Sequence, residues 1–268
     1  PAETFCQGLR NRFGGLPRHD HAADRGAFLT GLYGHLPGDL LDEQVELRVI
    51  RGDIGPEHKA FHPDPEGPQG FGFVVCEATY GDRQREDVTQ EERRRLLKAE
   101  VLAAMARGGN LVIPTFALER TQELLLDLAL LQRRKELPGT PIFIDSPLAS
   151  RATDVFERYA AELEDLDGGN IFNDPDLHFV GNVQESIRLN AMSGAIIMAA
   201  SGMCEGGRIR HHLLHNLHRR ESTILFVGFQ AQGSLGRIIL DGAERVRISG
   251  NDVRVRAQIR RIDSYSAH

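Results

Sequence analysis

Two acidic residues follow apolar runs that have the composition of buried strands. Asp53 comes after the run at residues 45–50, and Glu77 closes the run at residues 71–76. A carboxylate at the end of a strand can reach a metal ion or a reacting group, and its charge is costly beside an apolar core unless a cation or a histidine pairs with it. Asp53 also suits a turn and Glu77 a cap, so the residue types alone leave both a structural and a catalytic interpretation open.

Two glycine-bearing turns, each with an arginine, follow later apolar runs. The first follows residues 195–200 and contains Ser201, Gly202, Gly207 and Arg208; the second follows residues 223–229 and contains Gly233 and Arg237. Backbone N–H groups at such strand-to-helix turns can hold an anion, because the start of the next helix adds a partial positive charge. Two such turns on strands that we expect to be neighbours, each leading to an arginine, favour a phosphate-binding edge, although ordinary connections have the same composition.

Histidine supplies further candidate ligands and proton carriers. The loop histidines are His19, His21, His35 and His268. The spacing His19-x-His21 suits a metal ion, but so short a pattern also arises by chance. His211 and His212 are adjacent in an expected helix, so at most one of them faces a given site.

The elements that must position these residues alternate between strand and helix. Further buried strands are expected at residues 110–116, 141–145, 195–201 and 223–229, and amphipathic helices at residues 87–109, 117–137 and 147–163. The first helix opens with Asp87 and Gln90 at the spacing of a capping box, and Pro147 suits the first position of the third. Such alternation predicts an α/β fold with parallel strands, whose functional residues gather at the carboxyl ends of the strands.

The C-terminal segment has a different period. Residues 244–266 alternate around Gly250-Asn251, with one apolar face and one face rich in arginine. This pattern predicts a hairpin and therefore a β-rich end to the α/β body.

Length and composition exclude several classes of protein. The 268 residues carry a net charge of −6, are 41% hydrophobic, and include three widely spaced cysteines. A disordered chain and a disulfide framework are therefore excluded, and a reducing cytoplasm is the expected compartment. The longest apolar runs are far below the roughly 20 residues that span a bilayer, so we expect no membrane association. The chain begins with Pro rather than Met, and we expect it to be part of a longer protein.

Seven motifs in order resemble one family. They lie at residues 51–58, 76–83, 112–125, 142–153, 201–213, 226–237 and 264–268. Together they make the chain similar to the β-CASP branch of the metallo-β-lactamase-fold RNA nucleases. The resemblance implies an α/β fold with a partial metallo-β-lactamase-like αββα body at residues 1–83, an inserted parallel α/β β-CASP domain at 84–230, and a β-rich return to the body at 231–268.

The resemblance also implies roles for individual residues. His35 and Asp53 match zinc ligands of the family, with Asp53 bridging two zinc ions, and Glu77 and His268 match residues that assist proton transfer beside the metals. The implied function is hydrolysis of RNA phosphodiester bonds, by an endonuclease, a 5′ exonuclease or both. The implied partner is single-stranded RNA, and both a monomer and a homodimer stay open.

The chain departs from the family pattern in its N-terminal part. Only residues 18–25 resemble the signature His-x-His-x-Asp-His, with Asp24 displaced by one position. A catalytically inactive RNA-binding paralogue is therefore the main alternative. A DNA-processing relative and a small-molecule hydrolase are weaker alternatives.

Overall fold

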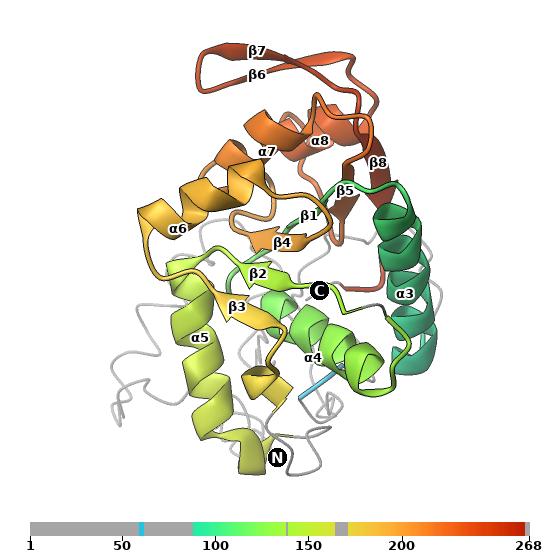
Figure 1. Cartoon of the computed structure of the whole chain (residues 1–268), viewed down its shortest axis with the longest axis vertical. Coiled ribbons are helices and arrows are strands. Elements are labelled where there is room, and N and C mark those ends of the chain that lie inside the picture. The colour runs from blue at the N-terminus through green and yellow to red at the C-terminus, as the bar shows by residue number, and fades with distance from the viewer. Residues whose placement is uncertain (1–58, 62–87, 138, 164–170, 266–268) are drawn as a thin grey trace, which may run out of the picture. The chain divides into compact units, whose positions relative to one another are not determined.

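The computed structural model describes residues 59–61, 88–137, 139–163 and 171–265 (Figure 1). All of them belong to one compact unit, which is made of residues 56–63 and 84–267. The strands predicted at residues 45–50 and 71–76 lie outside the described residues.

A six-stranded parallel sheet forms the centre of this unit. Its strand order is β3-β2-β4-β1-β5-β8, and every neighbouring pair is parallel. The strands are β1 (Leu111–Pro114), β2 (Ile142–Ile144), β3 (Leu177–Phe179), β4 (Ile196–Ala199), β5 (Thr223–Phe226) and β8 (Gln258–Arg261). The predicted α/β class with parallel strands is confirmed.

Helices cover both faces of the sheet (Figure 1). They are α3 (Gln90–Ala106), α4 (Arg120–Arg133), α5 (Pro147–Arg158), α6 (Val183–Arg188), α7 (Ile209–Asn216) and α8 (Leu235–Leu240), with 3₁₀ turns at Ala160–Glu162, Ile171–Asn173 and Leu189–Ala191. The three predicted helices correspond to α3, α4 and α5.

Successive side chains of a strand enter different cores, because strand side chains alternate between the two faces. Leu111 and Ile113 of β1 pack in the cluster that contains the buried residues of α3 and α4. Val112 between them packs with Ile209 of α7 and Ile239 of α8. Burial on both faces explains why these strands are continuous apolar runs, as in other parallel sheets.

The helix starts are set by short polar side chains. Ser146 caps α5 by accepting a hydrogen bond from the Ala149 N–H at 3.3 Å, and Pro147 takes the first helical position as predicted. In α3, however, the capping residue is Thr89, whose hydroxyl accepts from the Glu92 N–H at 3.2 Å. Gln90 is therefore the first helical residue, and the predicted opening of this helix at Asp87 is wrong.

The predicted C-terminal hairpin is shorter in the structure than in the sequence pattern. Strands β6 (Arg245–Ile248) and β7 (Asn251–Arg254) form the antiparallel hairpin, with Gly250 in its turn at φ 85°. The chain then leaves the hairpin, and β8 adds to the edge of the main sheet beside β5. The alternating pattern did not predict this, because it has the same period in a hairpin and in a sheet strand.

Two further predictions concern the domain boundary and membrane-spanning segments. The domain boundary predicted at residue 230 stays a prediction, although β5 and β8 on its two sides share one sheet. None of the helices in the described part of the chain has the length and apolar composition of a bilayer-crossing segment.

Candidate functional site

The carboxyl ends of four parallel strands bring three polar residues and a glycine to one edge of the sheet. Thr115 follows β1, Asp145 follows β2, Ser201 comes shortly after β4, and Gly228 comes shortly after β5. These strands are neighbours in the order β2-β4-β1-β5, so their ends lie side by side. This edge is where ligands bind in open α/β sheets, and we take it as the candidate site.

Asp145 is the centre of a hydrogen-bonded cluster at this edge. The carboxylate is fully buried, and its Oδ2 accepts a hydrogen bond from the Ser186 hydroxyl at 2.5 Å and lies 2.7 Å from Nε2 of His212. Its Oδ1 accepts from the Arg208 guanidinium at 2.5 Å. The ion pair with Asp145 thus fixes the position of Arg208, a predicted phosphate-binding residue, while 21% of the Arg208 side chain stays exposed.

The surroundings of Asp145 stabilise its charged form. Burial alone raises the pKa of a carboxyl, but the hydrogen bonds from His212, Ser186 and Arg208 outweigh burial, so the pKa of Asp145 lies below its ordinary value. His212 is fully buried, whereas His211 is exposed. The prediction that at most one of these adjacent histidines faces a site is confirmed.

The turn after β4 is closed by its own hydrogen bonds. The Ser201 N–H donates to the Gly206 carbonyl at 3.1 Å, and the Gly206 N–H donates to the Ser201 hydroxyl at 3.3 Å. Gly207 has φ 75°, and a Cβ there would lie 2.2 Å from the Ala200 carbonyl oxygen. Glycine is therefore required at position 207 for both its backbone angle and the close approach.

The turn after β5 is joined to the turn after β4. The Gly236 N–H donates to the Met203 carbonyl at 3.1 Å, and a carboxylate oxygen of Glu205 accepts from the Leu235 N–H at 2.5 Å. Arg237 pairs with Asp241 one helical turn later, at 2.8 Å. The two glycine turns are therefore adjacent, although β1 lies between β4 and β5 and these strands are not the direct neighbours that we expected.

An aromatic ring and a guanidinium lie at the same edge. Phe116 is 38% exposed, and the guanidinium carbon of Arg120 lies 5.3 Å from the centre of its ring. A Cβ at Gly202 would lie 2.7 Å from carbons of this ring, and a Cβ at Gly228 would lie 2.2 Å from the Arg120 guanidinium. Both glycines are thus needed for the close packing of this pair.

The predicted site residues divide into two groups. Ser201, Gly202, Gly207, Arg208, Gly233 and Arg237 are described and lie on the two joined turns or at the helix starts that follow them. The predicted metal and proton-transfer residues His35, Asp53, Glu77 and His268 lie outside the described residues. Within the described ranges, no group of three or more His, Cys, Asp or Glu side chains is placed to hold a metal ion.

Sequence reasoning missed the role of Asp145. The sequence pattern placed residues 141–145 in a strand and Pro147 at the start of the next helix, and gave Asp145 no part in the site. The partners of Asp145 come from α6 and α7, so no local spacing could have indicated them. The available signal was a carboxylate directly after a fully apolar strand, the same argument that singled out Glu77.

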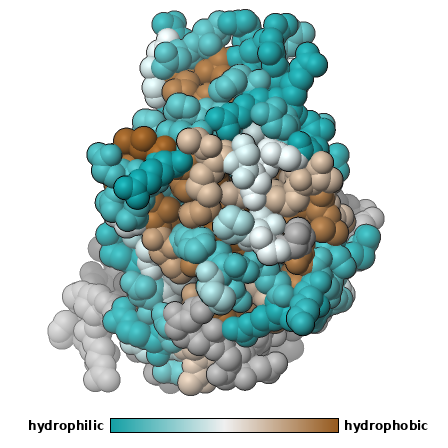
Figure 2. Space-filling view, in the orientation of Figure 1, coloured by the Kyte–Doolittle hydropathy of each residue, from teal (hydrophilic) through white to brown (hydrophobic). Residues whose placement is uncertain are grey.

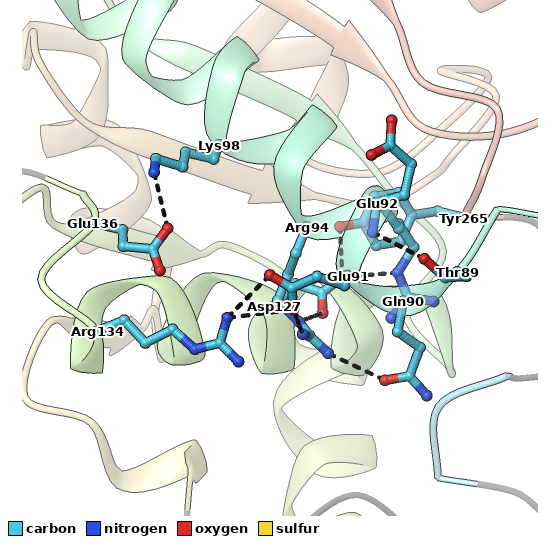
Figure 3. Close-up of polar contacts among 11 residues, drawn as sticks. Thr89, Gln90, Glu91, Glu92, Arg94, Lys98, Asp127, Arg134, Glu136 and Tyr265 are labelled. Carbon is cyan, nitrogen blue, oxygen red and sulfur yellow. Dashed lines mark hydrogen bonds and ion pairs between the residues drawn. The ribbon is translucent and has the colours of Figure 1, made fainter.

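A second buried polar cluster joins α3, α4 and the C-terminal segment (Figure 3). Asp127 of α4 is fully buried and accepts hydrogen bonds from Nε of Arg93 at 2.8 Å, from Nε of Arg94 at 2.9 Å and from the Tyr265 hydroxyl at 2.7 Å. The guanidinium of Arg93 also stacks over the Tyr265 ring, 4.8 Å from its centre. Tyr265 is three residues before His268, so this cluster anchors the chain that leads to a predicted site residue.

Burial and charge affect the titration of this cluster. Burial, together with the neighbouring Asp127 carboxylate, raises the pKa of Tyr265 well above its ordinary value. Burial also raises the pKa of Glu123, against the attraction of Arg93. The Tyr265 hydroxyl therefore stays protonated and remains a hydrogen-bond donor across the physiological range.

Comparison with known proteins gives one domain family and several relatives. Residues 121–239 match the Beta-Casp domain. The chain is 38% identical over 249 residues to Ribonuclease TTHA0252 of Thermus thermophilus, covering 89% of this chain and 57% of that protein. It is 29% identical to an RNase J-like protein of Methanocaldococcus jannaschii over 88% of this chain and 56% of that protein.

A further relative is matched over a smaller share of this chain and of its own length. The chain is 28% identical to Transcription termination factor FttA of Cenarchaeum symbiosum, over 73% of this chain and 32% of that protein. The chain thus spans between 32% and 57% of the length of these curated relatives. The Beta-Casp match includes the two joined turns and both residues, Asp145 and Arg208, that form the buried ion pair.

Proposed function

Because the chain belongs to the β-CASP branch of the metallo-β-lactamase fold, we propose that the protein is a zinc-dependent ribonuclease that hydrolyses phosphodiester bonds of single-stranded RNA. The observation that carries this proposal is the 38% identity, over 89% of this chain, to a protein named a ribonuclease. The edge formed by the two joined glycine turns supports it, because the guanidinium of Arg208 is partly exposed there and can contact a phosphate.

Different residues are proposed for zinc binding and for proton transfer in this reaction. Two zinc ions, when bound, would supply a water of lowered pKa, and His35 and Asp53 are the residues of this chain proposed to hold them. Glu77 would keep the His268 imidazole charged, so that His268 donates its proton to the leaving 3′ oxygen. This assignment rests on the resemblance of the motifs around these residues.

Substrate contacts are proposed for the described edge. Ser201, Gly202, Gly207, Arg208, Gly233 and Arg237 would hold phosphates next to the one that is cleaved. Contacts to phosphate fix the position of the strand and carry no base preference. Asp145 would orient Arg208, because the ion pair fixes one side of the guanidinium and leaves the exposed side for a phosphate.

The experiment is cleavage of a labelled single-stranded RNA by the zinc-loaded protein and by Asp53→Ala. We expect cleavage by the unchanged protein and loss of at least about 100-fold in rate for Asp53→Ala, because the variant would lack one of the residues proposed to hold zinc. Asp154→Asn, which removes an exposed carboxylate on α5, is the matched control. Equal rates for the unchanged protein and Asp53→Ala would contradict the proposal.

The mode of cleavage requires a second substrate. A circular RNA has no 5′ end, so its cleavage identifies an endonuclease. A linear RNA degraded only when its 5′ end is accessible identifies a 5′ exonuclease. DNA of the same sequence, left intact under the same conditions, separates the ribonuclease from a DNA-processing relative.

One observation favours the alternative of an inactive RNA-binding paralogue. Only residues 18–25 resemble the family signature of zinc ligands. Such a paralogue would bind RNA yet hold no stoichiometric zinc. Metal analysis of the purified protein separates the two functions before any assay of activity.

A further inference from the structure

The β6–β7 hairpin has one face that is fixed to the unit. Its buried side chains Val246, Ile248 and Val253 pack in the same cluster as Ile239 of α8. The chain that leaves the hairpin is held as well, because the N–H groups of residues 256 and 257 both donate to the Leu217 carbonyl, at 2.7 and 2.9 Å. The hairpin is therefore a fixed element with a defined outer face.

The outer face of the hairpin is rich in arginine. Arg245 lies opposite Arg254, and Arg247 lies opposite Asp252, in the antiparallel register. Arg256 follows two residues after Arg254, and all four arginines are exposed. In Figure 2 hydrophilic residues dominate this end of the molecule, at the top of the view. Between residues 244 and 256 only two carboxylates, Glu244 and Asp252, oppose the four arginines.

Most of this positive charge is not neutralised by the protein. Asp252 pairs with Arg245, whose Nε donates to Oδ2 at 2.8 Å. Across the described ranges of the chain, Arg247, Arg254 and Arg256 take part in no ion pair. The whole chain carries a net charge of −6, so this concentration of positive charge is a local feature and does not reflect the overall composition.

The pairing of Arg245 with Arg254 does not favour the hairpin, whereas Arg247 lies opposite Asp252. Like charges directly opposite each other on paired strands destabilise the pair, and Arg245 faces Arg254. Side chains two residues apart on one strand are about 7 Å apart on the same face. Arg245, Arg247 and Arg254 therefore share one face of the hairpin, and Arg256 follows just beyond β7, a concentration of cations that a chain of anions would stabilise.

We propose that the outer face of the β6–β7 hairpin, formed by Arg247, Arg254 and Arg256, binds the phosphate backbone of the RNA strand. This site is additional to the turns after β4 and β5, and it rests on the proposed function, in which RNA is the substrate. Residues 244–256 contain no aromatic residue, so no base can stack on one here, and the contacts are to phosphate and independent of sequence. The hairpin would therefore raise affinity for RNA without selecting its bases.

The test compares two triple variants with the same loss of charge. The hairpin variant carries Arg247→Gln, Arg254→Gln and Arg256→Gln. The control variant carries Arg151→Gln, Arg188→Gln and Arg220→Gln, which removes three exposed arginines on α5, α6 and the loop after α7. Binding of a fluorescein-labelled single-stranded RNA is measured by anisotropy in 50 to 200 mM KCl.

The expected result is specific to the hairpin variant. Its Kd should rise about tenfold or more, and the slope of log affinity against log salt should fall by about 2, since each lost phosphate contact of a single strand removes roughly 0.7. A third variant with lysine at the same three positions should keep both affinity and slope, because lysine retains the charge. Thermal melting of all three variants verifies that they are folded.

Different failures have different meanings. If the unchanged protein neither binds nor cleaves RNA, the proposed function fails. If it does both, and the hairpin and control variants lose equal affinity, only the assignment of the hairpin is overturned. If the hairpin variant binds RNA normally but has lost affinity for polyglutamate, the partner is an acidic protein segment and the assignment to RNA is wrong.

Discussion

The Tyr265 hydroxyl donates a hydrogen bond to Oδ2 of Asp127 at 2.7 Å, although 138 residues separate the two in sequence. Both side chains are fully buried. Asp127 lies in the middle of α4, and Tyr265 follows β8, the last strand of the sheet. The contact therefore ties the C-terminal end of the unit to a helix from its first half.

Replacement of Tyr265 by phenylalanine tests this contact. Tyr265→Phe should lower the free energy of unfolding by about 1–3 kcal/mol, because the Asp127 carboxylate loses one buried donor. Tyr159→Phe is the matched control, since Tyr159 is 53% exposed, and should change stability by less than about 0.5 kcal/mol. Urea denaturation of both variants measures the difference, and equal stabilities would contradict the structure.

The same hydroxyl predicts a dependence on alkaline pH. The pKa of Tyr265 is raised in the folded state from its ordinary value of 10.0, so the folded state keeps this proton longer than the unfolded chain. The contribution of Tyr265 is complete below pH 10 and is lost as the pH rises above it. Stability measured from pH 8 upward should therefore fall less steeply above pH 10 in Tyr265→Phe than in the unchanged protein.

Asp145 predicts the opposite dependence, at acid pH. Its pKa is lowered in the folded state, so its contribution is present above the ordinary value of 3.8 and is lost as the pH falls through that region. Asp145→Asn should be less stable than the unchanged protein at pH 7, and the difference should shrink as the pH falls below about 4. A difference that stays constant from pH 7 to pH 3 would show that the charge of Asp145 does not stabilise the fold.

Two adjacent glycines in the turn after β4 provide a matched pair. Gly207→Ala should destabilise the protein by at least about 1–2 kcal/mol, because alanine is strained at φ 75° and its Cβ would meet the Ala200 carbonyl. A Cβ at position 206 would have no neighbouring atom within 4 Å, so Gly206→Ala should change the free energy of unfolding by less than about 0.5 kcal/mol. Thermal melting of the two variants distinguishes them, and equal melting temperatures would refute the close approach at Gly207.

Cys204 should be chemically inert in the folded protein. Burial, together with the nearby Glu205 carboxylate, raises the pKa of its thiol to about 12. Because the thiolate is the reactive form, iodoacetamide at pH 8 should leave Cys204 unmodified until urea unfolds the protein. Peptide mapping by mass spectrometry reports this residue separately, and alkylation at the rate of a free thiol would contradict its burial.

Local sequence patterns predicted the strands and helices whose formation depends on neighbouring residues. The run at residues 110–116 contains β1, and the start of α5 at Pro147 agrees with the preference of proline for the first helical turn. The error at the start of α3 is equally local, because Asp87 and Thr89 both suit a cap and only the backbone determines which residue is used. Boundaries differ by a few residues for this reason.

Long-range pairings could not be predicted from the same patterns. Strand β8 pairs with β5, yet its sequence alternates like the hairpin before it. The partners of Asp145 lie 41 and 67 residues away, at Ser186 and His212. Period and composition indicate which residues are buried but not which distant residues they meet, so the candidate site needed the sheet order before Asp145 could be included.

The central position of β1 affects the order of events during synthesis. Leu111 pairs with Ile196 of β4 and with Thr223 of β5, so its two neighbours leave the ribosome long after it does. Until then the buried side chains of α4 can pack on α3 but not on a completed sheet, so the nascent chain exposes part of this apolar surface to water. A chaperone that shields this helix would therefore matter most during the translation of residues 134–226, and synonymous codons that slow this stretch would lengthen the interval in which the unfinished chain can aggregate.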